Sequence, residues 1–231
     1  MAVESKFRED KDLAFLQHAD WQDLKILAEA LIKDHSGTEQ WTGQLKKTLT
    51  QNISMYKTSE AEAYQNSWKA IAAELQLFGG DTIANLTRRK GVLYEELLHD
   101  VAKKVKIDFH KGTTSVANLE EKILRSLFGC ITTLNDINVI YETLEKEGLL
   151  GLTSFKSDSW NTIKKGIGNR SKVSTAALLL SRANPVTAIA TVPLALKGVS
   201  DPAYRVTIPA VCIVAMMRTK YTNNSASFDE F

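Results

Sequence analysis

The chain has 231 residues, of which 44% are hydrophobic and 24% are charged. These are the values of an ordinary globular protein with a sizeable core, and the length suits one large domain or a domain with an appendage. The net charge of +2 comes without the clustered arginines and interleaved aromatic residues of a nucleic-acid interface, so we expect no nucleic acid among the partners.

Helical periodicity begins soon after the first residues. We expect residues 1–10 to be flexible because they are mostly polar. A short helix is predicted over 10–19, and an amphipathic helix follows over 20–34, where leucine and alanine recur at helical spacing. Asp20 is the expected N-cap of this second helix, with Asp23 three positions later.

A stronger helix is predicted over 60–78, with Ser59 as its N-cap. Gly79 and Gly80 end it, as glycines do at the C-terminal end of a helix, and Asp81 caps the next helix. Because two glycines also let a partner approach the backbone, the alternative is a ligand-binding turn centred on Asp81. Capping is the interpretation that we favour.

More helices are expected before residue 148. No segment of the first 150 residues alternates apolar and polar residues over the length of a strand, so we predict an all-α fold. The predicted helices run over 92–107, 115–134 and 135–147, with a loop at 108–112. We expect residues 11–148 to form one helical domain.

The chain changes character after this domain. Residues 149–171 are rich in glycine and serine, and we interpret them as a connector. Residues 172–221 have almost no polar face, and we predict that they form an apolar helical hairpin packed on the first domain. The fold class is therefore a multi-helix globular bundle with an apolar hairpin near its end, and residues 222–231 are an expected flexible tail.

The apolar runs of this hairpin are short for a membrane span. The run between Arg182 and Lys197 contains 14 residues, and the run between Arg205 and Arg218 contains 12. At about 1.5 Å per residue these runs reach roughly 18–21 Å, against a hydrocarbon core of about 30 Å. Burial in the protein is the favoured interpretation, and a hairpin that inserts into a bilayer interface is the alternative.

The segment "DPAYRVTIPAVCIVAMM" contains a charge and a proline in an apolar run. Asp201 can cap a helix that begins at Pro202, and Arg205 then lies one turn along the same face. Pro209 has no amide to bond the carbonyl of Arg205, so a kink or a short non-helical join is expected near 208–209.

Basic residues offer a second candidate contact. Arg88 and Arg89 precede Gly91 at the end of a predicted helix, where positive charge is favourable beside the helix dipole and could also meet an anionic partner. Residues 171–231 carry six Lys or Arg against three acids, while the preceding residues carry 23 against 24. The apolar region is thus the basic one, which suggests an anionic membrane surface as a possible partner.

Residues that could support catalysis are few. Glu95 and His99 share a helix face and could supply two ligands of a metal-dependent enzyme, but no second cluster completes a site. A solvated face or a helical ion pair is the favoured interpretation. Cys130 and Cys212 lie in apolar runs and are expected to be free thiols in a reducing compartment. The charged N-terminus lacks the apolar stretch of a signal peptide, so we expect a cytoplasmic protein. We predict no catalytic residue, cofactor or metal.

Three stretches carry a family resemblance. "DKDLAFLQHADWQDLKILAE", "WKAIAAELQLFGGDTIANLTRRKGVLYEELLHDVAKKVKI" and "GVSDPAYRVTIPAVCIVAMMR" together resemble the YaaW-like bacterial proteins, a family linked by weak similarity to ubiquinol–cytochrome c chaperones. The resemblance implies a cytoplasmic helical protein and supplies no catalytic residues to carry over.

Two functions follow as hypotheses. The first is a non-enzymatic helical protein that binds another macromolecule, as an assembly factor or chaperone-like accessory would. The second is a membrane-docking or membrane-active protein, peripheral to the inner membrane, that uses the basic apolar hairpin. The residues singled out as contact or structural positions are Gly79, Gly80, Asp81, Arg88, Arg89, Asp201, Arg205 and Pro209.

Overall fold

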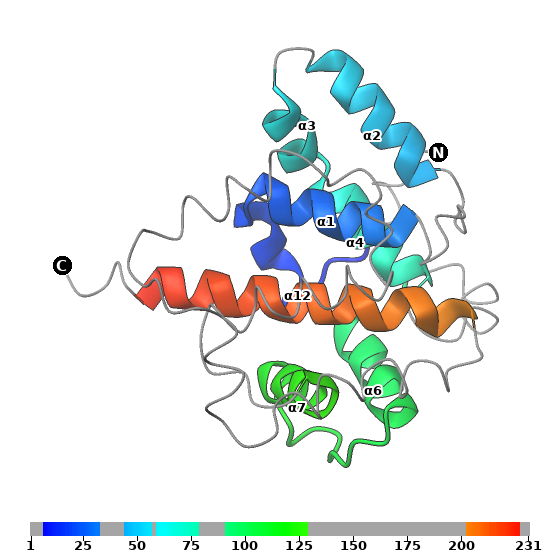
Figure 1. Cartoon of the computed structure of the whole chain (residues 1–231), viewed down its shortest axis with the longest axis vertical. Helices are drawn as coiled ribbons and strands as arrows, with labels where there is room; N and C mark the ends of the chain where they lie inside the picture. The colour runs from blue at the N-terminus through cyan, green and yellow to red at the C-terminus, as the bar shows by residue number, and fades with distance from the viewer. Residues whose placement is uncertain (1–6, 33–43, 57–58, 79–90, 129–201, 227–231) are drawn as a thin grey trace, which may run out of the picture.

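The fold of the described residues is entirely helical, which confirms the predicted class (Figure 1). The computed structural model describes residues 7–32, 44–56, 59–78, 91–128 and 202–226. In chain order the elements are the 3₁₀ helix η2 (Ala14–His18) and the α-helices α1 (Trp21–Ile32), α2 (Gln44–Met55), α3 (Glu60–Asn66), α4 (Trp68–Phe78), α6 (Tyr94–Lys104), α7 (Val116–Phe128) and α12 (Pro202–Ala226).

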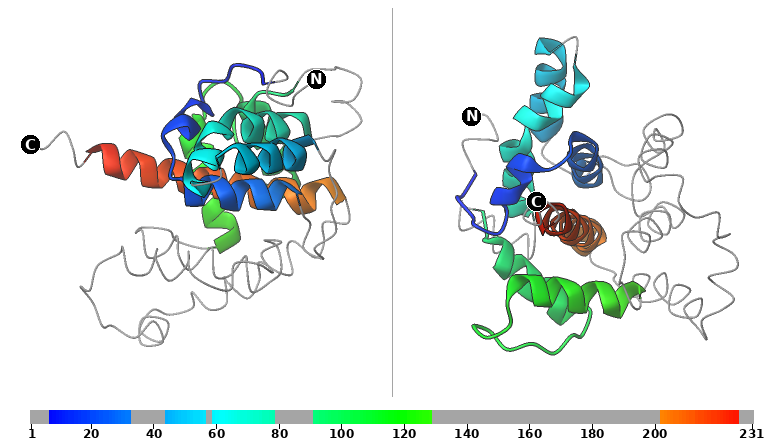
Figure 2. Two further views of the ribbon diagram at one scale, coloured as in Figure 1. Left: turned by 90° about the horizontal axis from the view of Figure 1, so that it is seen from above. Right: turned by 90° about the vertical axis from the view of Figure 1, so that its left-hand side faces the viewer.

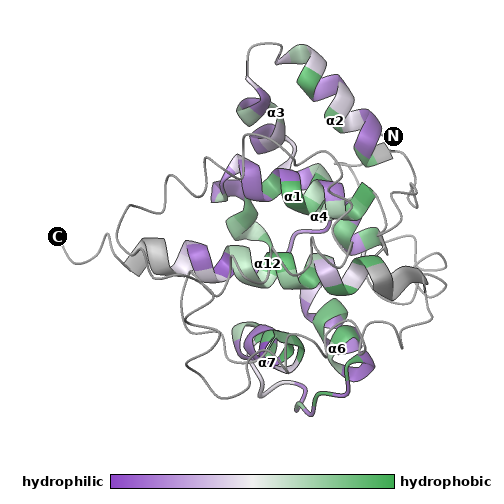
Figure 3. Ribbon diagram, viewed as in Figure 1, coloured by the Kyte–Doolittle hydropathy of each residue, from purple (hydrophilic) through white to green (hydrophobic). Residues whose placement is uncertain are grey.

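Helix α12 lies in the middle of the molecule. It contacts α1 and α4 on one side and α6 and α7 on the other (Figure 1). The second panel of Figure 2 views α12 nearly end-on, with α1 on one side of it and α7 on another. Residues 206–217 of this helix are all buried. Because this stretch of α12 is almost entirely apolar and buried (Figure 3), it needs neighbours on every side, and the other helices supply them.

The proline in α12 does not interrupt the helix. Pro202 is its first residue, the position where a missing amide costs nothing. Pro209 lies inside the same continuous helix, so the non-helical join expected near 208–209 is wrong. The lost hydrogen bond and ring clash of an interior proline cost about 3 kcal/mol. Burial of the surrounding apolar side chains, including Ile208 and Val211, offsets this cost.

The structure does not show the predicted apolar hairpin. Helix α12 covers residues 202–221 of that prediction, contacts α1, α4, α6 and α7, and continues as far as Ala226, into the predicted tail. Residues 172–201, which would form the first half, lie outside the described residues, as do 129–171 with the predicted connector. No helix in the described part of the chain combines the length and hydrophobicity needed to cross a bilayer.

The helix predicted over 60–78 is two helices. Ser59 caps the first one as expected, since its hydroxyl accepts a hydrogen bond from the Glu62 amide at 3.2 Å. A break occurs at Ser67, which is fully buried. The Ser67 hydroxyl donates to the Ala63 carbonyl at 2.7 Å and accepts from Asn52 Nδ2 of α2 at 2.7 Å. This local bond competes with the helical backbone pattern, so α4 starts afresh at Trp68.

The segment before η2 is held against the body from Phe7 onward. The Phe7 ring meets the Trp68 ring edge-on, with 5.5 Å between centroids. The buried Asp10 carboxylate accepts a hydrogen bond from the Tyr94 amide at 2.7 Å. That amide belongs to the first turn of α6, where no backbone acceptor is available, so Asp10 caps a helix 84 positions away.

Candidate functional site

Most of the residues singled out in the sequence cannot be located. Gly79, Gly80, Asp81, Arg88, Arg89 and Asp201 lie outside the described residues, and so does the side chain of Arg205. Pro209 is buried within α12. The structure therefore draws attention to three other features: an exposed tip on α2, a pair of ionic anchors on α12, and a cavity beside one of them.

The α2 tip consists of Ile53 and Met55. Helix α2 buries Leu45 and Leu49 against the rest of the protein, while 40% of Ile53 and 75% of Met55 remain exposed. Among the described residues, the other large apolar side chain with comparable exposure is Tyr221, whose ring packs beside Phe15. Helices α2 and α3 project from the body in Figure 1, so the α2 tip is accessible.

The first anchor centres on Arg218 of α12. Its Nε donates to Glu120 Oε2 of α7 at 2.8 Å, and its Nη2 donates to the backbone carbonyl of Asp12 at 2.5 Å. The guanidinium also lies over the Phe15 ring, 4.6 Å from its centroid. Tyr94 of α6 donates its hydroxyl to the other carboxylate oxygen of Glu120 at 2.8 Å. Arg218 thus joins α12 to α7, the segment before η2 and, through Glu120, α6.

Burial dominates the protonation chemistry of this anchor. Burial raises the pKa of Glu120 above its ordinary value, and the opposing effect of Arg218 does not cancel it. Burial also raises the pKa of Tyr94 well above its ordinary value, and the neighbouring carboxylate adds to this. Tyr94 therefore acts as a neutral donor, and ionised Glu120 depends on its two donors for stabilisation.

The second anchor is Lys220. Its ammonium group donates to Asp23 Oδ2 at 2.8 Å and to the Asp20 carboxylate. Burial raises the pKa of Asp23, with Lys220 opposing that effect. The sequence predicted Asp20 as the N-cap of α1, with Asp23 three positions later. Asp20 directly precedes the helix, and both carboxylates accept hydrogen bonds from a lysine about 200 positions later in the chain.

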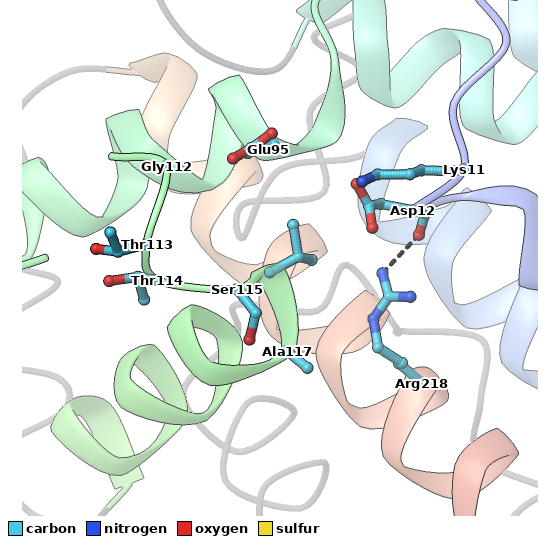
Figure 4. Close-up of a pocket in the computed structure, with 10 residues that line it drawn as sticks. Lys11, Asp12, Glu95, Gly112, Thr113, Thr114, Ser115, Ala117 and Arg218 are labelled. Carbon is cyan, nitrogen blue, oxygen red and sulfur yellow. Dashed lines mark hydrogen bonds between the residues drawn. The ribbon is translucent and has the colours of Figure 1, made fainter. Parts of the chain in front are cut away.

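A cavity of about 450 Å³ opens beside the first anchor (Figure 4). Its charged lining consists of Lys11, Asp12, Glu95 and Arg218, which come from the segment before η2, from α6 and from α12. The loop and first turn of α7 at 112–117 complete the wall. Two positive and two negative residues therefore line one open cavity, although they lie far apart in the sequence.

Glu95 and His99 share one face of α6, where His99 is buried. Their Oε1 and Nε2 atoms are 4.0 Å apart, and the imidazole stacks on Phe109 with 4.7 Å between ring centroids. Burial lowers the pKa of His99, so the ring is neutral near pH 7. Within the described residues, no group of three His, Cys, Asp or Glu side chains is placed to hold a metal ion.

The position of Glu120 in the sequence could have indicated the first anchor. Glu120 is three, four and seven positions from Ile123, Leu124 and Leu127, which are buried along α7. A carboxylate on the apolar face of an amphipathic helix needs a cation or a donor when the helix packs. The identity of that cation, Arg218, could not be read from spacing because 98 positions separate the two residues.

Comparisons with known proteins find similar sequences over most of the chain. A family model described as "Domain of unknown function (DUF3944)" matches residues 7–41, which include η2, α1 and the acids of the second anchor. The UPF0174 protein YaaW of Escherichia coli strain K12 is 31% identical over 230 residues, covering 90% of this chain and 94% of the relative. A UPF0174 protein of Helicobacter pylori strain J99 is 27% identical over 241 residues, covering 93% of each.

The match to YaaW of Escherichia coli strain K12 extends over nearly the whole length of both proteins, so the chain belongs to the UPF0174 family. This confirms the YaaW-like resemblance seen in the sequence. No solved structure matches the chain.

Proposed function

We propose that this protein acts by binding a partner protein through the α2 tip, in the role of a non-enzymatic accessory or assembly factor. The observation that carries the proposal is the exposure of Met55 and Ile53 on a projecting helix. The cytoplasmic location implied by the sequence remains part of the proposal.

The α2 tip offers binding energy that the isolated protein does not use. Full burial of a side chain the size of methionine or isoleucine contributes about 1.5–3 kcal/mol. The unbranched thioether of Met55 can adapt to an irregular partner surface. Met55 is the more exposed of the two, and it is an apolar side chain of the kind that protein interfaces bury.

The charge on α2 indicates the chemistry of the partner. Residues 44–55 contain Lys46 and Lys47 and no acid. An interface that buries the α2 tip would place these lysines near its rim, where opposite charges favour correct encounter. The expected partner is therefore a protein with an apolar contact surface bordered by acidic residues.

Membrane docking by the apolar segment is the alternative function. Its apolar residues, 206–217, are buried among α1, α4, α6 and α7, so they would have to leave the core before touching lipid. The exposed surface favours a protein partner, and lipid binding is treated as a competing outcome in the test.

The test uses a photo-crosslinking amino acid placed at position 55 in the full-length protein. We expect one discrete adduct in cells, whose partner is identified by mass spectrometry and then purified. The matched control places the same amino acid at Ser126, an exposed position on α7, and should not give that adduct. Binding of the purified partner should weaken about tenfold to a hundredfold in Met55→Gln, in proportion to the apolar burial lost.

Three results would contradict the proposal. An adduct of twice the chain mass would indicate self-association. Equal affinity of wild type and Met55→Gln for the purified partner would place the interface elsewhere. Sedimentation with vesicles of phosphatidylcholine and phosphatidylserine that is lost in Met55→Gln would identify the α2 tip as a lipid contact.

A further inference from the structure

The cavity beside Arg218 has a charge arrangement that the proposed function does not use. It lies among α6, α7 and the end of α12, whereas α2 lies on the other side of α12 (Figure 1). Its residues are therefore separate from the α2 tip.

The cationic side of the cavity is rigid and has spare donors. Arg218 is fixed through Nε and Nη2, and only 18% of its side chain is exposed. Its Nη1 has no hydrogen-bond partner among the described residues, so the N–H groups of this atom are available to a ligand. The Val116 and Ala117 amides in the first turn of α7 add donors on the neighbouring wall, as helix starts do.

The carboxylates that line the cavity also lack hydrogen bonds among the described residues. The Asp12 backbone is tied by the bonds of its carbonyl to Arg218 and its amide to Asp10, but its carboxylate has no hydrogen bond within the described residues. Burial is the main reason that the pKa of Asp12 is raised, and the nearby Asp10 adds to the effect. Among the described residues, the charged-group partner of Glu95 is His99, at 4.0 Å, and Glu95 lines the same cavity.

The two sets of groups call for opposite charges in one ligand. A simple anion would satisfy Arg218 but would face the carboxylates of Asp12 and Glu95, and a simple cation would face Arg218 and Lys11. A molecule that carries both charges satisfies all four side chains, and a volume of about 450 Å³ suits a small ligand.

We propose that the cavity binds a small zwitterion, with its carboxylate at Arg218 and the first turn of α7 and its ammonium group at Asp12 and Glu95. Lys11 at the rim adds to the attraction for the carboxylate. The chemical class is that of free amino acids.

The experiment is a titration of the ¹⁵N-labelled full-length protein followed by NMR. Glycine, β-alanine and γ-aminobutyrate serve as probes because they separate the two charges by increasing numbers of bonds. We expect at least one of them to shift the amides of Ser115, Val116 and Ala117 with saturation. Glycinamide and N-acetylglycine each lack one charge, and we expect binding about tenfold weaker or worse because a charged hydrogen bond is lost.

Variants separate this site from a general surface effect. Asp12→Asn should weaken the binding of the zwitterion about tenfold and leave the thermal midpoint unchanged, since the carboxylate makes no hydrogen bond in the folded protein. Asp100→Asn is the control, an exposed acid one turn and a half along α6 from Glu95, and should bind as wild type does.

The proposal is overturned if no zwitterion shifts these amides. It is also overturned if N-acetylglycine or inorganic phosphate binds as tightly as the best zwitterion, which would indicate an anion site, or if Asp12→Asn binds like wild type. None of these results bears on the α2 tip.

Discussion

Removing the cation of the first anchor gives the sharpest test of the core. Arg218→Met keeps an apolar side chain of similar length and leaves the Glu120 carboxylate, which is 4% exposed, without its ionic partner. Breaking a buried pair in this way costs about 3–5 kcal/mol. We expect the lower end, about 3 kcal/mol, because Tyr94 still donates to Glu120.

The partner variants separate the charge from the packing. Glu120→Gln keeps the shape and an acceptor oxygen, so we expect a loss of about 1–2 kcal/mol. The double variant Glu120→Gln with Arg218→Met has no charge at the first anchor, and its loss should be smaller than the sum of the two single losses by roughly 2 kcal/mol. The assay is urea unfolding of the full-length protein followed by circular dichroism.

The dependence on pH identifies the carboxylate as the cause. The folded pKa of Glu120 is raised, so its contribution to stability is complete below the unfolded pKa and falls as the pH rises through the folded pKa. Arg218→Met removes the cation that opposes this shift, so the pKa should rise further. The stability difference from wild type should therefore be larger at about pH 8 than at about pH 5. A difference below about 1 kcal/mol, or one equal at both pH values, would refute the reasoning.

Three further predictions concern other parts of the core. Gly91→Ala would place a Cβ atom 2.7 Å from Gln76 Cβ, and we expect a loss of about 1–3 kcal/mol, which an unchanged thermal midpoint would contradict. Ser59→Ala removes the acceptor for the Glu62 amide and should cost about 1 kcal/mol in urea unfolding; a change within error would argue against the cap. Cys212 is fully buried and burial raises its thiol pKa to about 12, so mass spectrometry should find it alkylated in urea but not in the folded protein. Equal labelling in both states would show that α12 opens readily.

Local signals in the sequence predicted local structure well. Ser59 was predicted as an N-cap, a position that serine prefers, and it caps α3. The helices predicted over 20–34, 92–107 and 115–134 contain α1, α6 and α7, whose buried apolar residues follow helical spacing. The break at Ser67 escaped prediction because serine is tolerated inside helices. Here it is the additional bond from Asn52 of another helix that fixes the break.

Contacts between residues far apart in the chain could not be predicted from the sequence. Asp20 and Asp23 carry the pattern of a helix start, and nothing in their neighbourhood indicates Lys220. Pro209 is a strong local breaker, yet its surroundings hold it in a continuous helix, since tertiary packing outweighs propensity. The cavity lining likewise comes from four separate stretches of chain and exists only once α12 is in place.

The position of α12 also bears on how the protein is made. The ribosome synthesises this helix after every other described helix, so α1, α4, α6 and α7 emerge before the segment that fills the space between them. Until then their apolar faces are without a common partner, and folding depends on contacts between residues up to 206 positions apart. A nascent chain of this kind is prone to aggregate while it waits, and a premature stop before residue 202 would release a chain unable to close its interior.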